Sequence, residues 1–163
     1  DRPGRLALSC RDFARFGLLI LREGRWRERV VVRPELLRMA VGSPLPADFP
    51  LSGGREAPLL PNQRTMGGKR NITPVGPGYY SFNWWLNGTN AAGQRLFPDA
   101  PADAFAASGH GGKRVLLLIP SLDLIVCWND SRIDDHDASP GNPATRMNQA
   151  VRRVRDCVLP EDP

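Results

Sequence analysis

The chain has 163 residues, of which 41% are hydrophobic and 24% charged, a composition typical of a globular domain with its own apolar core. Its formal net charge of +5 comes from 22 basic residues against 17 acidic ones, and the basic residues are nearly all arginines spread along the chain. Nucleic-acid-binding surfaces gather basic residues in one patch with aromatics between them, so this spread argues against a nucleic-acid partner.

Neither a disulfide framework nor a membrane span is predicted. The three cysteines, Cys10, Cys127 and Cys157, are widely spaced and odd in number, and we interpret them as small packed thiols. No apolar run approaches the roughly 20 residues that span a bilayer. Because Asp1-Arg2-Pro3-Gly4 is neither a methionine start nor a signal peptide, we expect the sequence to begin within a longer protein.

Residues 9–23 are predicted to form the first helix. Ser9 and Asp12 make a capping-box-like start, because the serine hydroxyl accepts a backbone N–H and an acidic side chain is favoured in the first turn. Apolar residues recur on one face of this helix: Phe13, Phe16 and Ile20. Gly24 is placed to end the helix.

A second helix and a long loop follow. Residues 25–32 are predicted to form a short turn and an extended piece, and Pro34, at a first helical position, predicts a helix over residues 34–41. Residues 42–78 are rich in Pro, Gly, Ser and Asn and are predicted to form a loop. Loops of this length in a domain are often lids or binding loops.

Alternating aromatic residues predict one strand over residues 79–86. The more buried face of this strand would carry Tyr80, Phe82, Trp84 and Leu86. Ser81 and Asn83 would lie on the less buried face. Tyr80 and Trp84 would therefore share a face. Core packing is the simplest role for these aromatic side chains, and lining an acyl or sugar subsite is the alternative.

The C-terminal part predicts a hairpin and a helix. After a Pro- and Ala-rich loop, strands over 113–120 and 122–129 are joined by a tight turn. Every side chain of residues 115–119 is apolar, which predicts an interior strand with helices on both sides. The last helix is predicted over 142–158, with Asn142 as its cap and an apolar stripe of Met147, Val151, Val154 and Val158. The fold class expected is α/β (α+β), with an antiparallel sheet flanked by helices.

The turn Ser108–Lys113 opens directly into this hairpin. Its sequence, Ser-Gly-His-Gly-Gly-Lys, leaves one basic side chain, that of His110, and a bare backbone at the edge of a sheet. Such an arrangement is suited to holding an oxyanion. A histidine in a glycine-rich turn is otherwise an ordinary turn residue with a satisfied ring nitrogen, and this alternative stays open.

The ordered series of segments from Leu8 to Val158 resembles the C-terminal half of a β-lactamase-related serine hydrolase of the class C type. This group contains class C β-lactamases, DD-peptidases and related esterases. The resemblance is carried by the capped helix Ser9–Leu19, the turn Gly24-Arg25-Trp26, the aromatic segment Gly78–Trp85, the turn Gly109-His110-Gly111-Gly112, the Pro120/Asp123 hairpin and the final helix.

The resemblance implies acyl transfer through a serine ester, on an ester, amide or β-lactam substrate, without a metal or cofactor. His110 would take the basic position of the family's third motif, and Gly111 and Gly112 would let the substrate approach closely. The backbone N–H of Lys113 would supply half of the oxyanion hole. Of the aromatic residues, Tyr80 and Trp84 are the candidates for contact with substrate. A periplasmic or secreted location fits the family, and a cytoplasmic one stays open.

The family's nucleophile is missing from the sequence. None of the eight serines is followed three residues later by lysine, and no Tyr-x-Asn occurs. Ser81-Phe82-Asn83 matches Ser-x-Asn literally, but it lies too close to His110, and we interpret it as coincidence. We therefore expect this chain to contribute one cleft wall, with the other half upstream or in a second chain. The alternative is a non-catalytic binding or scaffold protein, either degenerate or truncated.

Two further motifs are set aside. Asp134-Asp135-His136-Asp137 has residue types that bind divalent metals, but four consecutive residues seldom converge on one ion, and we interpret them as a solvated loop. Gly67-Gly68-Lys69 lacks the first glycine and the following Ser or Thr of a phosphate-binding loop. No metal site is predicted.

Overall fold

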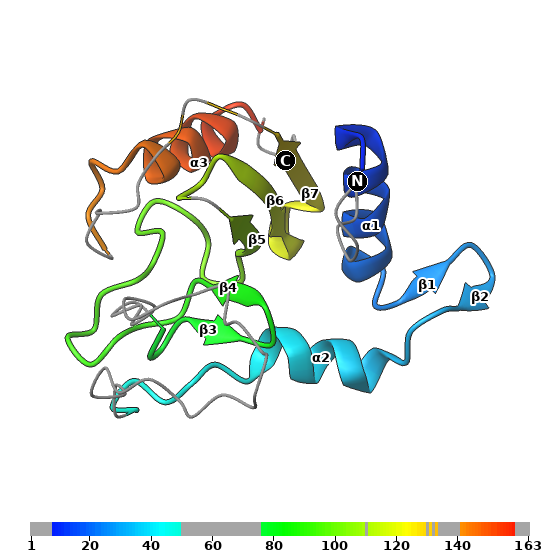
Figure 1. Ribbon diagram of the computed structural model, residues 1–163, viewed down its shortest axis with the longest axis horizontal. Coiled ribbons are helices and arrows are strands. Elements are labelled where there is room, and N and C mark those ends of the chain that lie inside the picture. The colour runs from blue at the N-terminus through cyan, green and yellow to red at the C-terminus, as the bar shows by residue number, and fades with distance from the viewer. Residues whose placement is uncertain are drawn as a thin grey trace, which may run out of the picture.

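A computed structural model describes residues 8–49, 76–109, 111–129, 131, 133 and 141–158. In this part of the chain, three helices flank a five-stranded antiparallel sheet of order β3-β4-β5-β6-β7, which confirms the expected α+β class (Figure 1). The helices are α1 (Cys10–Leu21), α2 (Pro34–Gly42) and α3 (Arg146–Asp156). The strands of the main sheet are β3 (Tyr80–Ser81), β4 (Trp84–Leu86), β5 (Phe105–Gly109), β6 (Arg114–Ile119) and β7 (Leu124–Trp128). A separate two-stranded hairpin is formed by β1 (Arg25–Trp26) and β2 (Arg29–Val30).

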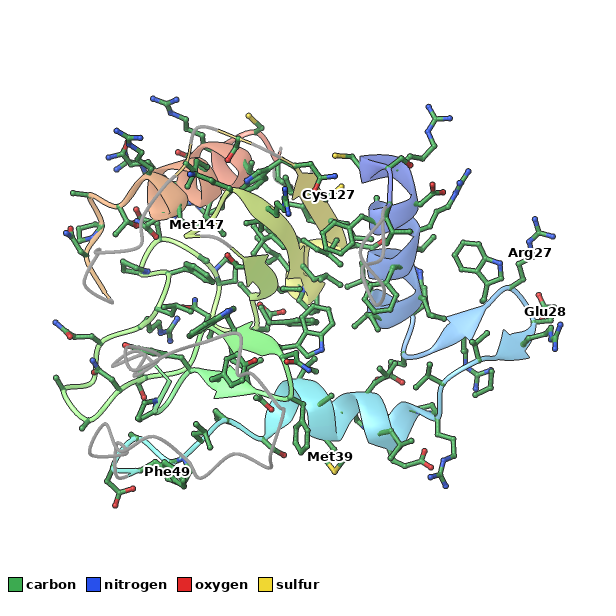
Figure 2. The ribbon with its side chains drawn as sticks, in the orientation of Figure 1. Arg27, Glu28, Met39, Phe49, Cys127 and Met147 are labelled. Atoms are coloured by element: carbon green, nitrogen blue, oxygen red, sulfur yellow. The ribbon has the colours of Figure 1, made fainter. Side chains whose placement is uncertain are left out.

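Strand β6 is the centre of the core, as its apolar sequence predicts. All five residues from Val115 to Ile119 are fully buried. One face of the sheet packs under α3, which carries Met147 (Figure 2). Leu117 of β6 belongs to the same hydrophobic cluster as Met147 and Val151. The other face packs against α1 and α2, with Leu116 in a cluster with Ile20. The sheet is therefore covered on both sides, which confirms the sequence prediction.

The aromatic segment is a hairpin and not the single strand predicted over 79–86. Phe82 and Asn83 have positive φ angles of 38° and 71° and form the turn between β3 and β4. Tyr80 pairs with Trp85, and Ser81 pairs with Trp84. Tyr80 and Trp84 consequently lie on opposite faces, so the prediction that they share a face was wrong. The alternation hid the turn because a two-residue turn without glycine carries no strong sequence signal.

Ser81 also differs from its expected place. It is buried, not on the less buried face, and its hydroxyl donates a 2.7 Å hydrogen bond to the carbonyl of Ala40 in α2. This bond ties the first strand of the sheet to the last turns of α2. The hydroxyl has a structural partner, which agrees with the interpretation of Ser-x-Asn as coincidence.

Strand β5 was predicted as part of a Pro- and Ala-rich loop. It pairs with β6 at five positions, from Phe105 opposite Leu118 to Gly109 opposite Arg114. Its residues are mostly small, and alanine and glycine have low intrinsic preference for strands. The neighbouring strands β4 and β6 decide this segment's conformation, since they supply its hydrogen-bond partners on both sides.

The predicted N-cap residue is correct for α1 and wrong for α3. The Ser9 hydroxyl accepts a 3.1 Å hydrogen bond from the backbone N–H of Asp12, as predicted for α1. Helix α3 begins at Arg146, after Thr145, whose hydroxyl accepts from the N–H of Asn148 at 3.0 Å. Asn142, the predicted cap, instead closes a turn just before the helix through a 2.9 Å bond with the N–H of Ala144.

Removing the Ser9 cap has a measurable expected effect. Ser9→Ala should lower the melting temperature by about 2–4 °C, because an orphan N–H of α1 loses its acceptor. The Ser9 hydroxyl is also the main cause that lowers the pKa of Asp12, ahead of Arg15. An NMR titration should therefore find that the pKa of Asp12 rises in the variant.

Ser43→Ala is the control for this change. Ser43 is exposed at the end of α2, and its hydroxyl makes no hydrogen bond to any described residue. Equal losses of melting temperature in the two variants would contradict the cap assignment.

The cysteines are less packed than expected. Cys10 and Cys157 are exposed, and only Cys127 is half-buried, so the interpretation as packed thiols was wrong for two of the three. None of the helices in the described ranges is long and apolar enough to cross a membrane.

Candidate functional site

The glycine-rich turn lies at one end of the sheet, where several segments meet. Strand β5 runs toward the turn and ends at Gly109, and β6 leaves it at Arg114. Because β4 runs antiparallel to β5, the Phe82–Asn83 tip lies at this same end. Strand β7 also ends here, at Trp128, since it is antiparallel to β6.

Two of the three described glycines of the turn, Gly111 and Gly112, adopt a left-handed backbone. Gly111 has φ 64° and Gly112 has φ 93°, a region that side chains disfavour. Gly112 is also buried, and a Cβ placed on it would lie 2.7 Å from the Cγ2 atom of Ile133. The turn therefore requires glycine at position 112 for two independent reasons, its backbone angle and its contact with Ile133.

The end of β7 and the residues after it hold this turn in place. The carbonyl of Gly112 accepts a 2.8 Å hydrogen bond from the indole N–H of Trp128 and a 3.4 Å bond from the hydroxyl of Ser131. The backbone N–H of Ser131 donates to the carbonyl of Lys113 at 3.1 Å. Three hydrogen bonds thus anchor two consecutive carbonyl groups.

This anchoring determines the direction of the next backbone N–H. In a trans peptide the C=O and the N–H of one peptide unit point in opposite directions, and there is no cis peptide among the described residues. Since the Gly112 carbonyl points to Trp128, the N–H of Lys113 points to the opposite side. The side chain of Lys113 is half-buried in the turn.

The aromatic residues near this end have different surroundings. Trp84 is buried, with its ring 5.3 Å from that of Phe105 in an edge-to-face contact and 6.4 Å from that of Phe16 in a stacked one. Tyr80 is half-buried, and its ring contacts Trp85 edge to face at 4.9 Å. Trp84 thus contacts the buried ring of Phe105 and the exposed ring of Phe16, while Tyr80 lies on the other face. Their predicted contact with substrate stays a prediction.

Tyr79 has a purely structural place. It is almost completely buried, and its hydroxyl donates a 2.6 Å hydrogen bond to the carbonyl of Gln94. Burial raises the pKa of this hydroxyl above its ordinary value. The residue fastens the loop after β4 to the sheet and is not a proton donor facing the turn.

Several predicted residues lie outside the described part of the chain. They are His110, the segment Asp134–Asp137 and the segment Gly67–Lys69. Their roles stay predictions. Within the described residues, no group of three or more His, Cys, Asp and Glu side chains comes together to hold a metal ion.

Comparison with known proteins adds no family. No protein-family model matches this sequence, and no curated protein matches it significantly. The chemical interpretation of the turn therefore depends on its residues and geometry.

The two residues that anchor the turn, Trp128 and Ser131, were not predicted from the sequence. Trp128 is the last residue of an apolar run, and nothing in that run distinguishes an indole that donates from one that only packs. Ser131 follows the strand in an irregular segment. Their partner, the Gly112 carbonyl, is 16 residues away from Trp128 and 19 from Ser131, so only the β6–β7 pairing reveals the contact.

Proposed function

We propose that this chain forms one wall of the cleft of a serine hydrolase that works by acyl transfer on an ester, amide or β-lactam. In this proposal the backbone N–H of Lys113 is one donor of the oxyanion hole, and His110 supplies the basic side chain beside it. The finer assignment of the fold, to the C-terminal portion of a β-lactamase/transpeptidase-like domain, belongs to the same proposal. No metal or cofactor takes part.

One observation carries the proposal: the anchored carbonyl of Gly112. An oxyanion hole needs a donor that already points at the developing charge, because a rigid donor does not have to reorganise during the reaction. The bond from Trp128 fixes the plane of the Gly112–Lys113 peptide and so fixes the direction of the Lys113 N–H. Adjacent glycines keep the backbone free of side chains where a substrate carbonyl would approach.

The attacking serine must come from residues outside this chain, since it contains no Ser-x-x-Lys. A second observation supports a further segment beside α1 and α2. Large apolar side chains are exposed there, including Phe16, Leu18, Leu36 and Met39, each with 38% or more of its surface accessible. Exposed apolar surface of this kind commonly marks a contact with another element or chain.

A non-catalytic binding protein is the competing function, favoured by the missing nucleophile. The coding sequence upstream of Asp1 distinguishes the serine hydrolase from the binding protein. We expect it to encode Ser-x-x-Lys followed by Tyr-x-Asn, whereas a start codon immediately upstream would contradict a single-chain enzyme.

Labelling tests the chemistry directly. The full-length protein is treated with a fluorophosphonate or a fluorescent penicillin, and incorporation is measured on a denaturing gel. We expect covalent labelling that His110→Ala slows by about 100-fold, the usual size of a lost acid–base group. A folded full-length protein that takes up neither probe would contradict the enzyme proposal and favour the binding alternative.

The anchor makes a second prediction for the same assay. Trp128→Phe keeps the ring but removes the N–H that holds the Gly112 carbonyl, so labelling should slow by up to about 100-fold through misplacement of the donor. Trp26→Phe is the matched control, because Trp26 is exposed on the β1–β2 hairpin. Equal rates in the two variants would contradict the role of the anchor.

A further inference from the structure

Two cysteines that are far apart in the sequence meet where α1 packs on β7. The thiol of Cys127 donates a 3.0 Å hydrogen bond to the backbone carbonyl of Cys10, across 117 positions of the chain. Figure 2 labels Cys127 at the point where β7 passes the first turn of α1. The carbonyl oxygen and the Cβ atom of one residue are about 3 Å apart, so the sulfur of Cys127 lies within about 6 Å of the Cβ atom of Cys10.

The Cys10 thiol also affects the pKa of the Cys127 thiol. Burial is the main cause that raises the pKa of the Cys127 thiol. The Cys10 thiol raises that pKa further, through repulsion between the charged forms and through a side-chain hydrogen bond.

We propose that Cys10 and Cys127 are a peroxide-reactive thiol pair that closes to a disulfide joining α1 to β7. The two cysteines differ in solvent exposure: Cys10 is exposed and Cys127 is half-buried. An oxidant from solvent therefore meets Cys10 first, and Cys127 is positioned as the resolving thiol. The thiol pair does not depend on the acyl-transfer proposal, because neither residue belongs to the turn.

The reaction balances with hydrogen peroxide as the oxidant. The Cys10 thiolate attacks one peroxide oxygen, the S–O bond forms, the O–O bond breaks, and hydroxide leaves. The Cys127 thiolate then attacks the sulfur of the Cys10 sulfenic acid, the S–S bond forms, and hydroxide leaves again. The two thiol protons convert both hydroxides to water, so two thiols and one peroxide yield one disulfide and two waters.

Cys157 has a different position. It follows α3, which covers the face of the sheet opposite to α1. The sheet therefore separates it from Cys10. Replacing Cys157 should leave the closure unaffected, and this makes it the matched control.

The disulfide should stabilise the fold strongly. It would close a loop of more than 100 residues, and cross-links across long loops reduce the entropy of the unfolded chain most. It would also join the first turn of α1 covalently to β7, where a hydrogen bond already connects them. The oxidised chain should melt about 10 °C above the reduced chain.

The experiment treats the full 163-residue chain with hydrogen peroxide and follows free thiols, intact mass and melting temperature. We expect the loss of two thiols and two hydrogens per chain, a Cys10–Cys127 cross-linked peptide, and reversal by dithiothreitol. Cys157→Ser should behave in the same way, and Cys10→Ser should lose both the cross-link and the rise in melting temperature.

Three results would overturn the proposal. They are a cross-link that involves Cys157 or a second chain, closure that persists in Cys10→Ser, and oxidation of Cys10 to a sulfinic acid without any cross-link. Cys10 is exposed, so the serine variant is expected to fold and to give a clear result.

Discussion

Replacing Gly112 with alanine is expected to lower the free energy of unfolding by about 3 kcal/mol. The left-handed backbone at φ 93° disfavours any side chain, which accounts for part of this loss. The remainder comes from crowding, because the new methyl group would lie 2.7 Å from the Cγ2 atom of Ile133. A shift of the turn that relieves this contact would also disturb the hydrogen bond from Trp128 to the Gly112 carbonyl.

Urea denaturation of the variant and of Gly109→Ala measures this effect. Gly109 is the matched control in the same turn, because its φ is not positive and a Cβ there would lie more than 4 Å from the other described residues that surround it. We expect its unfolding free energy to change by less than about 1 kcal/mol. Similar losses at positions 109 and 112 would show that the turn is sensitive to any added methyl group, against the argument from Ile133.

The second large effect is expected at the centre of the sheet. Leu117→Ala should lower the free energy of unfolding by about 3–4 kcal/mol, since it removes fully buried methyl groups and leaves a cavity. Leu117 lies opposite Ala106 on β5 and Val126 on β7, under α3. The small Ala106 and the backbone around it cannot expand to fill the space, so collapse of the cavity should be limited.

Leu18→Ala tests whether the effect is due to burial. Leu18 is on α1 with 38% of its surface exposed, and its truncation should cost less than about 1 kcal/mol. Both variants are compared by urea denaturation with a shared slope. A loss at Leu117 no greater than that at Leu18 would contradict the placement of β6 in the interior.

The candidate site was predicted only in part. Gly111 and Gly112 were recognised because a backbone without side chains lets a substrate approach closely. Their left-handed conformation, which Gly109 does not share, is shown only by the structure. The anchoring residues Trp128 and Ser131 were not recognised, because an indole or a hydroxyl near a strand end has no sequence signal for its partner. The hydrogen bond between the Cys127 thiol and the Cys10 carbonyl was not predicted for the same reason.

The sequence by itself determined the features that depend on neighbours within a few positions. The Ser9 cap of α1, the proline at the start of α2 and the unbroken apolar run of β6 are of this kind, and each is present. Local hydrogen bonds and burial on both faces leave a direct trace in residue type and spacing.

Tertiary structure alone decided the conformation of β5, the Phe82–Asn83 turn and the hydrogen bond between Trp128 and Gly112. Small residues such as those of β5 become a strand only because β4 and β6 offer hydrogen-bond partners on both sides. The turn separates two aromatic pairs whose alternation would suit one continuous strand equally well. In each case the free energy comes from contacts with segments elsewhere in the chain, which no local pattern records.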